Sequence, residues 1–216
     1  MKRATALTVS LLFSSLLFSS LLYAQSFRII ARGGVQNLSS GGSSFTYPGG
    51  SLGFYYEINE AMRVGIDADL FSKSYREYLR LEQFKGYTSW GYPEYRVAYV
   101  ERKARETWVP LHAVFMADIA RSSRIEFSGG LGAGILRVSY NEPSTVFTWN
   151  DGTLGYLPEY RYSETYFSLS SHAVLSVFLT ERFGLGADLR SRFVFASSEV
   201  AVGIGAMGGV IVRLGQ

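Results

Sequence analysis

The sequence predicts an all-β fold: an eight-stranded antiparallel up-and-down transmembrane β-barrel that follows an N-terminal signal peptide. Three observations support this fold class. From Ser26 onward, apolar residues recur at every second position, which is the period of a β-strand. After residue 24 no apolar run is long enough for a membrane helix, so a spanning structure must be a closed barrel. Tyr and Phe, which favour strands, each occur 15 times, and the absence of cysteine excludes disulfides and thiolate chemistry.

The N-terminal segment has the layout of a secretory signal peptide. Lys2 and Arg3 are followed by an uncharged stretch over residues 4–22 and by the small residue Ala24. The alternative is a membrane-anchor helix, but three Ser-Leu-Leu repeats dilute the hydrophobicity of the stretch. We therefore expect export and cleavage after Ala24.

This cleavage defines the domain organisation. We expect a signal peptide at residues 1–24 and one outer-membrane β-barrel domain at residues 25–216. Removing Lys2 and Arg3 from the 21 basic residues leaves 19, against 18 acidic ones. The basic excess therefore lies mostly in the signal peptide, and no nucleic-acid partner is expected.

Eight segments show the alternation. They cover residues 26–35, 50–58, 63–78, 105–119, 124–140, 163–180, 182–196 and 199–214. One face of each segment is apolar and uncharged, as in Val109, Leu111, Ala113 and Phe115. The opposite face carries the charged side chains.

Alternation alone does not show which face points outward, because a soluble lipocalin-like barrel has the same period. Three features favour an apolar exterior. Short links near residues 59–60, 121–123 and 180–181 alternate with long connections at 36–49, 79–104 and 141–162, as in outer-membrane barrels. The polar face uses compact Arg and Asp, while the lysines lie outside the membrane-level segments. Aromatic residues form two candidate girdles, with Phe27, Tyr56, Phe127 and Phe183 near the short turns and Phe167, Phe193 and Phe195 near the long connections.

With this architecture, residues 25–216 resemble the small eight-stranded outer-membrane barrels of the OmpA transmembrane domain and OmpX type. The resemblance implies outer-membrane lipid or lipopolysaccharide and the barrel assembly machinery as partners, and the outer membrane of a Gram-negative-type bacterium as location. Barrels of that family end with an aromatic residue that the assembly machinery recognises. Here the aliphatic Val212 and Leu214 precede Gly215 and Gln216.

The polar face predicts a charge network inside a lumen that eight strands leave only wide enough for side chains. Pairing across the short turns places Glu57 opposite Arg63 and His172 opposite Arg190. It also places Asp118 opposite Glu126, a repulsion that Arg121 or Arg124 could relieve. The predicted lumen network comprises Arg28, Arg32, Glu57, Arg63, Asp67, Asp69, Asp118, Glu126, His172, Asp188, Arg190 and Arg192.

Other motifs predict no chemistry. Gly130, Gly132 and Gly134 form a row that would make room for Val114, His112 and Pro110 on the opposite strand. The string at residues 203–208 matches the dinucleotide pattern G-x-G-x-x-G, but no helix follows it. With only two histidines, His112 and His172, no His-rich metal site is possible, and we expect no metal and no cofactor.

Ser170 and His172 share a face, which allows the hypothesis of a lipid A-modifying barrel enzyme. Such a pair must meet lipid, whereas both residues here fall on the lumen face. A buried polar network is the preferred interpretation, and we expect no catalytic residues.

The long connections are rich in aromatic and basic residues, which binding surfaces use. The candidate binding residues are Tyr87, Trp90, Tyr92, Tyr95, Trp149 and Tyr156. Alternatively, these connections are strand hairpins that project beyond the bilayer and pair their tyrosines across strands. Arg137 falls on the lipid face near the outer end of its strand, where it could meet lipopolysaccharide phosphate or mark a β-bulge.

The sequence therefore predicts a non-enzymatic outer-membrane barrel that serves envelope integrity, or adhesion and binding of an extracellular ligand through its loops. The alternative is a narrow channel for small or hydrophobic solutes.

Overall fold

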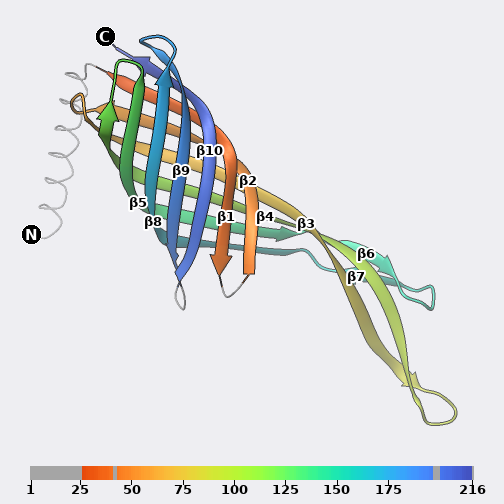
Figure 1. The fold of residues 1–216 in the computed structure, drawn as a ribbon. Helices are drawn as coiled ribbons and strands as arrows, with labels where there is room; N and C mark the ends of the chain where they lie inside the picture. Colours follow the sequence, from red (N-terminus) through yellow and green to blue (C-terminus); the bar gives the residue numbers. More distant parts are fainter. Residues whose placement is uncertain (1–25, 41–42, 197–199, 216) are drawn as a thin grey trace, which may run out of the picture.

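Eight long strands close into a barrel (Figure 1). Two of these strands project beyond the barrel at one end, and a separate two-stranded hairpin lies beside the projecting part. The computed structural model describes residues 26–40, 43–196 and 200–215. The strands are β1 (Phe27–Ser40), β2 (Ser43–Glu57), β3 (Met62–Tyr87), β4 (Pro93–Arg121), β5 (Ile125–Glu142), β6 (Thr145–Thr148), β7 (Leu154–Leu157), β8 (Tyr160–Phe178), β9 (Phe183–Phe195) and β10 (Val200–Leu214). Within these ranges no helix is long and apolar enough to cross a membrane. The predicted signal peptide lies outside the described residues.

The first and last strands of the barrel close it. The order round the barrel is β1-β10-β9-β8-β5-β4-β3-β2, and all of the pairings between neighbours are antiparallel. Phe27 in β1 pairs with both Leu214 of β10 and Tyr56 of β2. The ring leaves no free edge along the barrel wall, and the predicted up-and-down β-barrel is confirmed.

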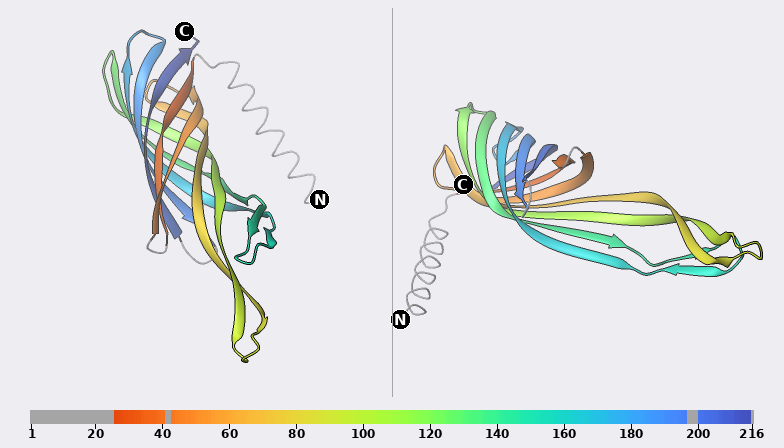
Figure 2. Two further views of the ribbon diagram at one scale, coloured as in Figure 1. Left: turned by 90° about the vertical axis from the view of Figure 1, so that its right-hand side faces the viewer. Right: turned by 90° about the horizontal axis from the view of Figure 1, so that it is seen from below.

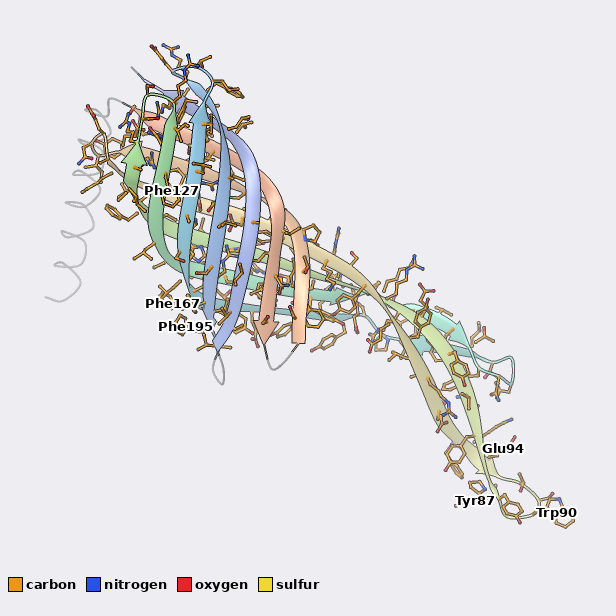
Figure 3. All side chains as sticks on the ribbon, viewed as in Figure 1. Tyr87, Trp90, Glu94, Phe127, Phe167 and Phe195 are labelled. Atoms are coloured by element: carbon orange, nitrogen blue, oxygen red, sulfur yellow. The ribbon has the colours of Figure 1, made fainter. Side chains whose placement is uncertain are left out.

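The outer wall of the barrel is apolar, as predicted. Leu131, Ile204 and Ile119 point outward and expose about two thirds of their surface or more. Such a continuous apolar wall is stable only against lipid, because a soluble protein would bury it. Phe127 lies toward the end of the barrel with the short turns, and Phe167 and Phe195 lie toward the opposite end (Figure 3). The labelled aromatic residues of the wall therefore lie near both ends of the barrel, where the two girdles were predicted.

The three predicted short turns lie together at one end of the barrel. They occupy residues 58–61, 122–124 and 179–182. In each, a backbone hydrogen bond closes the hairpin: Ile58 N donates to Met62 O, Ser122 N to Ile125 O and Leu179 N to Phe183 O.

The prediction of long loops at the opposite end is wrong, because most of those residues continue the strands. β1 and β2 remain paired as far as Ser40 and Ser43. β3 and β4 pair up to Tyr87 and Pro93 and form a projecting arm (Figures 1 and 2). The alternation of aromatic, aliphatic and charged residues does not stop at the end of the apolar wall, so neither does the strand pairing. The projecting hairpins considered as the alternative are therefore correct.

The third long connection also contains strands. β6 and β7 form a short hairpin beside the β3–β4 arm (Figure 2). Asn150, in the turn between them, donates its backbone N–H to the carbonyl of Val97 in β4, and the Asn150 side chain accepts the Val97 N–H in return. These bonds attach the hairpin to the arm.

Candidate functional site: the lumen and the projecting arm

A cluster of arginines surrounds Glu126 at the end of the lumen near the short turns. Arg28 and Arg63 approach the Glu126 carboxylate to 2.5 and 3.4 Å, and Arg213 also contacts it. Arg28 bonds Glu57 as well. The Glu126 carboxylate is buried, and only paired charges are tolerated at such a position.

A second ionic cluster lies further along the lumen. The guanidinium of Arg190 contacts Asp67, Asp69 and Asp188 at 3.0, 2.8 and 2.6 Å. Arg192 bonds Asp69 at 2.6 Å. The side chains of this cluster are almost completely buried. Removing any one charge would therefore leave an oppositely charged group buried without its partner.

Two sets of partners complete this cluster. Arg32 lies 3.3 Å from Asp67 and 3.4 Å from Asp188. Tyr55 donates its hydroxyl to Asp67 at 2.6 Å. Sequence reasoning missed Tyr55, although its position on the inward face of β2 placed it in the lumen.

Apolar side chains fill the space between and beyond the ionic clusters. Tyr55, Met116, Phe178 and Ile211 belong to one buried group, and Leu38, Tyr47, Phe71 and Met207 to another. Arg213 stacks on the ring of Phe178, 3.5 Å from its centroid. The lumen is thus filled by charged and apolar side chains.

The predicted pairs opposite each other in the sheet are partly correct. Glu57 lies opposite Arg63 and His172 opposite Arg190 in the strand register. Glu57 nevertheless bonds Arg28 rather than Arg63, because the inward side chains reach across the lumen as well as along the sheet.

The predicted juxtaposition of Asp118 and Glu126 is wrong. The turn is centred later in the chain than predicted, so Glu126 faces Arg121. A β-bulge between Asp118 and Ala120 then changes the register by one residue, so Asp118 faces Ser128. Ser128 donates a hydrogen bond of 2.7 Å to Asp118. Arg63 bonds both carboxylates and joins them, while Arg121 lies 3.3 Å from Glu126.

The partners of the glycine row also differ from the prediction. Gly130, Gly132 and Gly134 face Met116, Val114 and His112, two residues along from the predicted partners. A Cβ atom on Gly130 would come within 2.9 Å of the Met116 side chain. The predicted role, making room for larger side chains on β4, agrees with this geometry.

Ser170, His172 and Asp188 lie in line within the lumen. Ser170 Oγ is 3.0 Å from His172 Nε2, and His172 Nδ1 is 3.6 Å from Asp188 Oδ2. All three side chains are buried and face the lumen, away from the lipid-facing wall. His112 makes a separate bond of 2.7 Å to Ser168. No group of metal-ligating side chains occurs among the described residues.

The tip of the arm presents a set of exposed aromatic rings. Tyr87 and Trp90 expose 71% and 85% of their surface, and both lie at the far end of the hairpin (Figure 3). Tyr92 and Tyr95 are exposed beside them. Phe84 contacts both Tyr87 and Tyr95 edge to face, with centroids 5.2 and 5.7 Å apart. Four of the six candidate binding residues are therefore gathered at one tip.

The other two candidates lie on the shorter hairpin and differ in exposure. Tyr156 is exposed, whereas Trp149 exposes only 9% of its surface. Trp149 packs with Ala98 and Val100 of β4, and the guanidinium of Arg96 lies 4.6 Å from its ring centroid. The prediction of Trp149 as a binding residue is therefore wrong, because the β6–β7 hairpin buries it against the arm.

The turn between β6 and β7 is ordered by its own polar groups. The Thr153 hydroxyl donates to Asp151 at 2.6 Å and holds the pKa of that carboxyl below its usual value. Lys85 on the arm lies 3.8 Å from Asp151, and Arg96 donates to the Thr153 hydroxyl at 2.9 Å. These contacts add to the attachment of the short hairpin.

Arg137 points outward from β5 beyond the apolar wall. It faces Val109 and Thr165 in a register without interruption, so the alternative of a bulge at this position is wrong. Its Nε donates to Ser163 at 3.1 Å, and no carboxylate pairs with it among the described residues. Arg137 thus presents an uncompensated charge on the outer wall.

Comparison of the sequence with protein-family models and with curated proteins finds no match. Among solved structures, the fold is similar to Ail, the attachment invasion locus protein of Yersinia pestis, with a TM-score of 0.52 and 16% identity over 88% of this chain and 99% of that one. It is also similar to Neisserial surface protein A, with a TM-score of 0.50 and 16% identity over 87% of this chain and 97% of that one. Together with the closed ring, the filled lumen and the apolar wall, these similarities show that the chain has the fold of the small eight-stranded outer-membrane β-barrels.

Proposed function

We propose that this protein is a non-enzymatic outer-membrane barrel whose projecting arm binds an extracellular ligand. The observation that carries the proposal is the aromatic tip of the arm. Tyr87, Trp90 and Tyr92 each leave most of their surface open. Tyr87 and Trp90 lie at the end of the arm that is furthest from the barrel (Figure 3). Large rings left in water have a free-energy cost that burial against a partner would recover.

The charge of the arm indicates the chemistry of the ligand. Lys103 and Arg105 point outward from β4, and no carboxylate pairs with either among the described residues. Arginine and aromatic side chains together recognise anionic surfaces by charge and by stacking. The Ail structure contains the heparin analogue sucrose octasulfate, so a sulfated polyanion is the first ligand to test.

The filled lumen favours binding over transport. Arg190 and Arg192 occupy the space that a narrow channel for small or hydrophobic solutes would need. Conductance in planar bilayers separates the two functions, because the binding proposal expects no discrete openings. Openings that are lost in Arg190→Ser would favour the channel.

We further propose export through a signal peptide at residues 1–24, insertion of residues 25–216 by the barrel assembly machinery, and contact of Arg137 with lipopolysaccharide phosphate. The N-terminal sequence of the membrane-bound protein tests the cleavage after Ala24. The absence of catalysis is tested by mass spectrometry of lipid A from cells with and without the protein. A changed lipid A profile would favour an enzyme.

Whole cells provide the main test of ligand binding. Cells that display the wild-type protein should bind to a heparin-coated surface, and the triple variant Tyr87→Ser/Trp90→Ser/Tyr92→Ser should lose at least tenfold in retention. The matched control is Tyr78→Ser/Tyr99→Ser, which removes two exposed rings from the shaft of the arm. Equal retention of the wild type and the tip variant would contradict binding through the tip. Migration on a gel with and without boiling verifies that each variant is folded.

A further inference from the structure

A cavity of about 300 Å³ opens at the extracellular mouth of the barrel, between the plugged lumen and the base of the arm. It is separate from the aromatic tip described above. Its walls combine five aromatic with five aliphatic side chains, and one carboxylate lies among them. The residues that matter here are Phe45, Tyr47, Glu106, Trp108, Tyr162 and Tyr166.

Two hydrogen bonds fix the carboxylate of Glu106 in this cavity. The Tyr47 hydroxyl donates to Oε2 at 3.0 Å, and the Trp108 indole N–H donates to Oε1 at 2.7 Å. The rings of Tyr47 and Trp108 also contact each other, with centroids 5.4 Å apart. Glu106 is therefore held in one orientation by two of the aromatic walls.

Glu106 differs from the carboxylates deeper in the lumen because it has no ion pair. Asp67, Asp69, Asp188 and Glu126 each contact at least one arginine. No lysine or arginine of the described residues lies within ion-pair distance of Glu106. The mouth thus contains a fixed negative charge that the protein itself does not neutralise by contact.

Among the described residues, Lys73 and Glu164 are the other charged groups beside the walls of the cavity. Lys73 lies opposite Glu106 in the register, but its ammonium sits over the rings of Phe45 and Tyr47, 4.8 and 5.8 Å from their centroids. Glu164 accepts a hydrogen bond from Tyr166 and has no ion pair among the described residues. The aromatic wall therefore already accommodates one ammonium group, and two carboxylates remain to attract another.

From this arrangement we propose that the mouth cavity binds a small organic ammonium ion with an apolar body. Aromatic faces attract a desolvated cation, and the Glu106 carboxylate supplies the opposite charge. The cavity size lies at the lower end of the range for small-molecule sites. Arg192, which contacts Gln36 at 3.3 Å and stacks on Phe71, lies beneath and repels a cation from the deeper lumen. The site is a binding pocket and not the entrance of a cation path.

The test uses phenyltrimethylammonium with the whole protein in maltoside micelles, since phosphocholine detergents carry a quaternary ammonium of their own. The indole N–H signals of Trp90, Trp108 and Trp149 are followed by NMR. We expect a saturable shift of the Trp108 signal, because its N–H donates to Glu106, while Trp90 and Trp149 stay unchanged. Benzyl alcohol, a neutral ring compound, should bind at least tenfold more weakly.

Three variants make the test specific. Glu106→Gln keeps the size of the side chain and should weaken phenyltrimethylammonium at least tenfold. Lys73→Met removes the competing ammonium and should leave binding equal or tighter. Glu101→Gln is the matched control, because Glu101 lies on the arm paired with Arg76 at 3.0 Å. Unchanged affinity in Glu106→Gln, equal affinity for benzyl alcohol, or no saturable shift of Trp108 would each overturn the proposal.

Discussion

Arg190 of β9 and Asp69 of β3 form a salt bridge of 2.8 Å between strands that lie on opposite sides of the ring, although they are 121 residues apart in the chain. Such a bond holds the two walls of the barrel at a fixed separation. Salt bridges of this kind across the lumen hold the barrel closed, in addition to the backbone hydrogen bonds between neighbouring strands.

Replacing Arg190 by Met should destabilise the barrel strongly. The change leaves Asp67, Asp69 and Asp188 buried with fewer partners, and breaking a buried ion pair from one side costs about 3–5 kcal/mol. Urea unfolding of the protein in lipid vesicles, followed by tryptophan fluorescence, measures the loss. Arg80→Met, at an exposed position on the arm, is the control and should change stability by less than about 0.5 kcal/mol. A similar midpoint for both variants would contradict the role of Arg190.

Leu131→Arg tests the orientation of the wall. Leu131 exposes 70% of its surface in the middle of β5, and a charge facing lipid at that depth should cost roughly 2–4 kcal/mol and reduce assembly. Ser139→Arg, on the same outward face beyond the apolar wall, should assemble normally. The fraction of protein that resists unfolding without boiling measures the outcome. Normal folding of Leu131→Arg would mean that the wall does not face lipid.

Trp149→Ala and Trp90→Ala should distinguish a tryptophan that stabilises the arm from one that is only exposed on its surface. Trp149 is buried between the β6–β7 hairpin and β4, so its truncation should loosen the hairpin by about 3 kcal/mol, a typical loss for a buried Trp. Trp90 is exposed, and its truncation should leave the hairpin intact. Limited proteolysis is the measurement, with faster cleavage near residues 143–159 expected only for Trp149→Ala. Equal cleavage rates would show that Trp149 does not secure the hairpin.

Arg137→Ser should weaken association with lipopolysaccharide by removing an unpaired charge just beyond the apolar wall. A single charge-assisted contact is worth roughly 1.5–3 kcal/mol, or about tenfold or more in affinity. The measurement is the lipopolysaccharide retained by the purified protein. Arg161→Ser is the control, because Arg161 is already paired with Glu159 at 2.5 Å. Equal loss in both variants would point to general charge attraction.

The barrel and its inward and outward faces could be predicted from sequence because alternation fixes which side chains share a face. The short turns followed from the polar residues that interrupt the alternation. The bulge at Asp118 could not be predicted, because Ile119 and Ala120 are both apolar and either one continues the pattern. The turn is also centred later in the chain than predicted, since Arg121 pairs with Glu126, and this displacement together with the bulge misplaced the partners of Glu126 and Gly130.

The ionic partners were harder to predict than the lumen residues themselves. The sequence orders side chains along each strand and across each hairpin, and these rules placed Arg190 opposite His172. The bond from Arg190 to Asp69 crosses the lumen between strands that are not neighbours, so it depends on the curvature of the closed sheet. The pairing of Trp149 with β4 likewise depends on how a separate hairpin folds back.

The distribution of inward charges has a consequence for how the barrel closes. Basic groups gather where the first and last strands meet, with Arg28 and Arg32 on β1 and Arg213 on β10. Their acidic partners, among them Asp67 and Glu126, lie on β3 and β5. An open sheet would carry like charges along both of its free margins, which repel each other. We therefore expect β1 and β10 to pair with each other last during folding, after the strands that carry the acidic partners have curved round to face them.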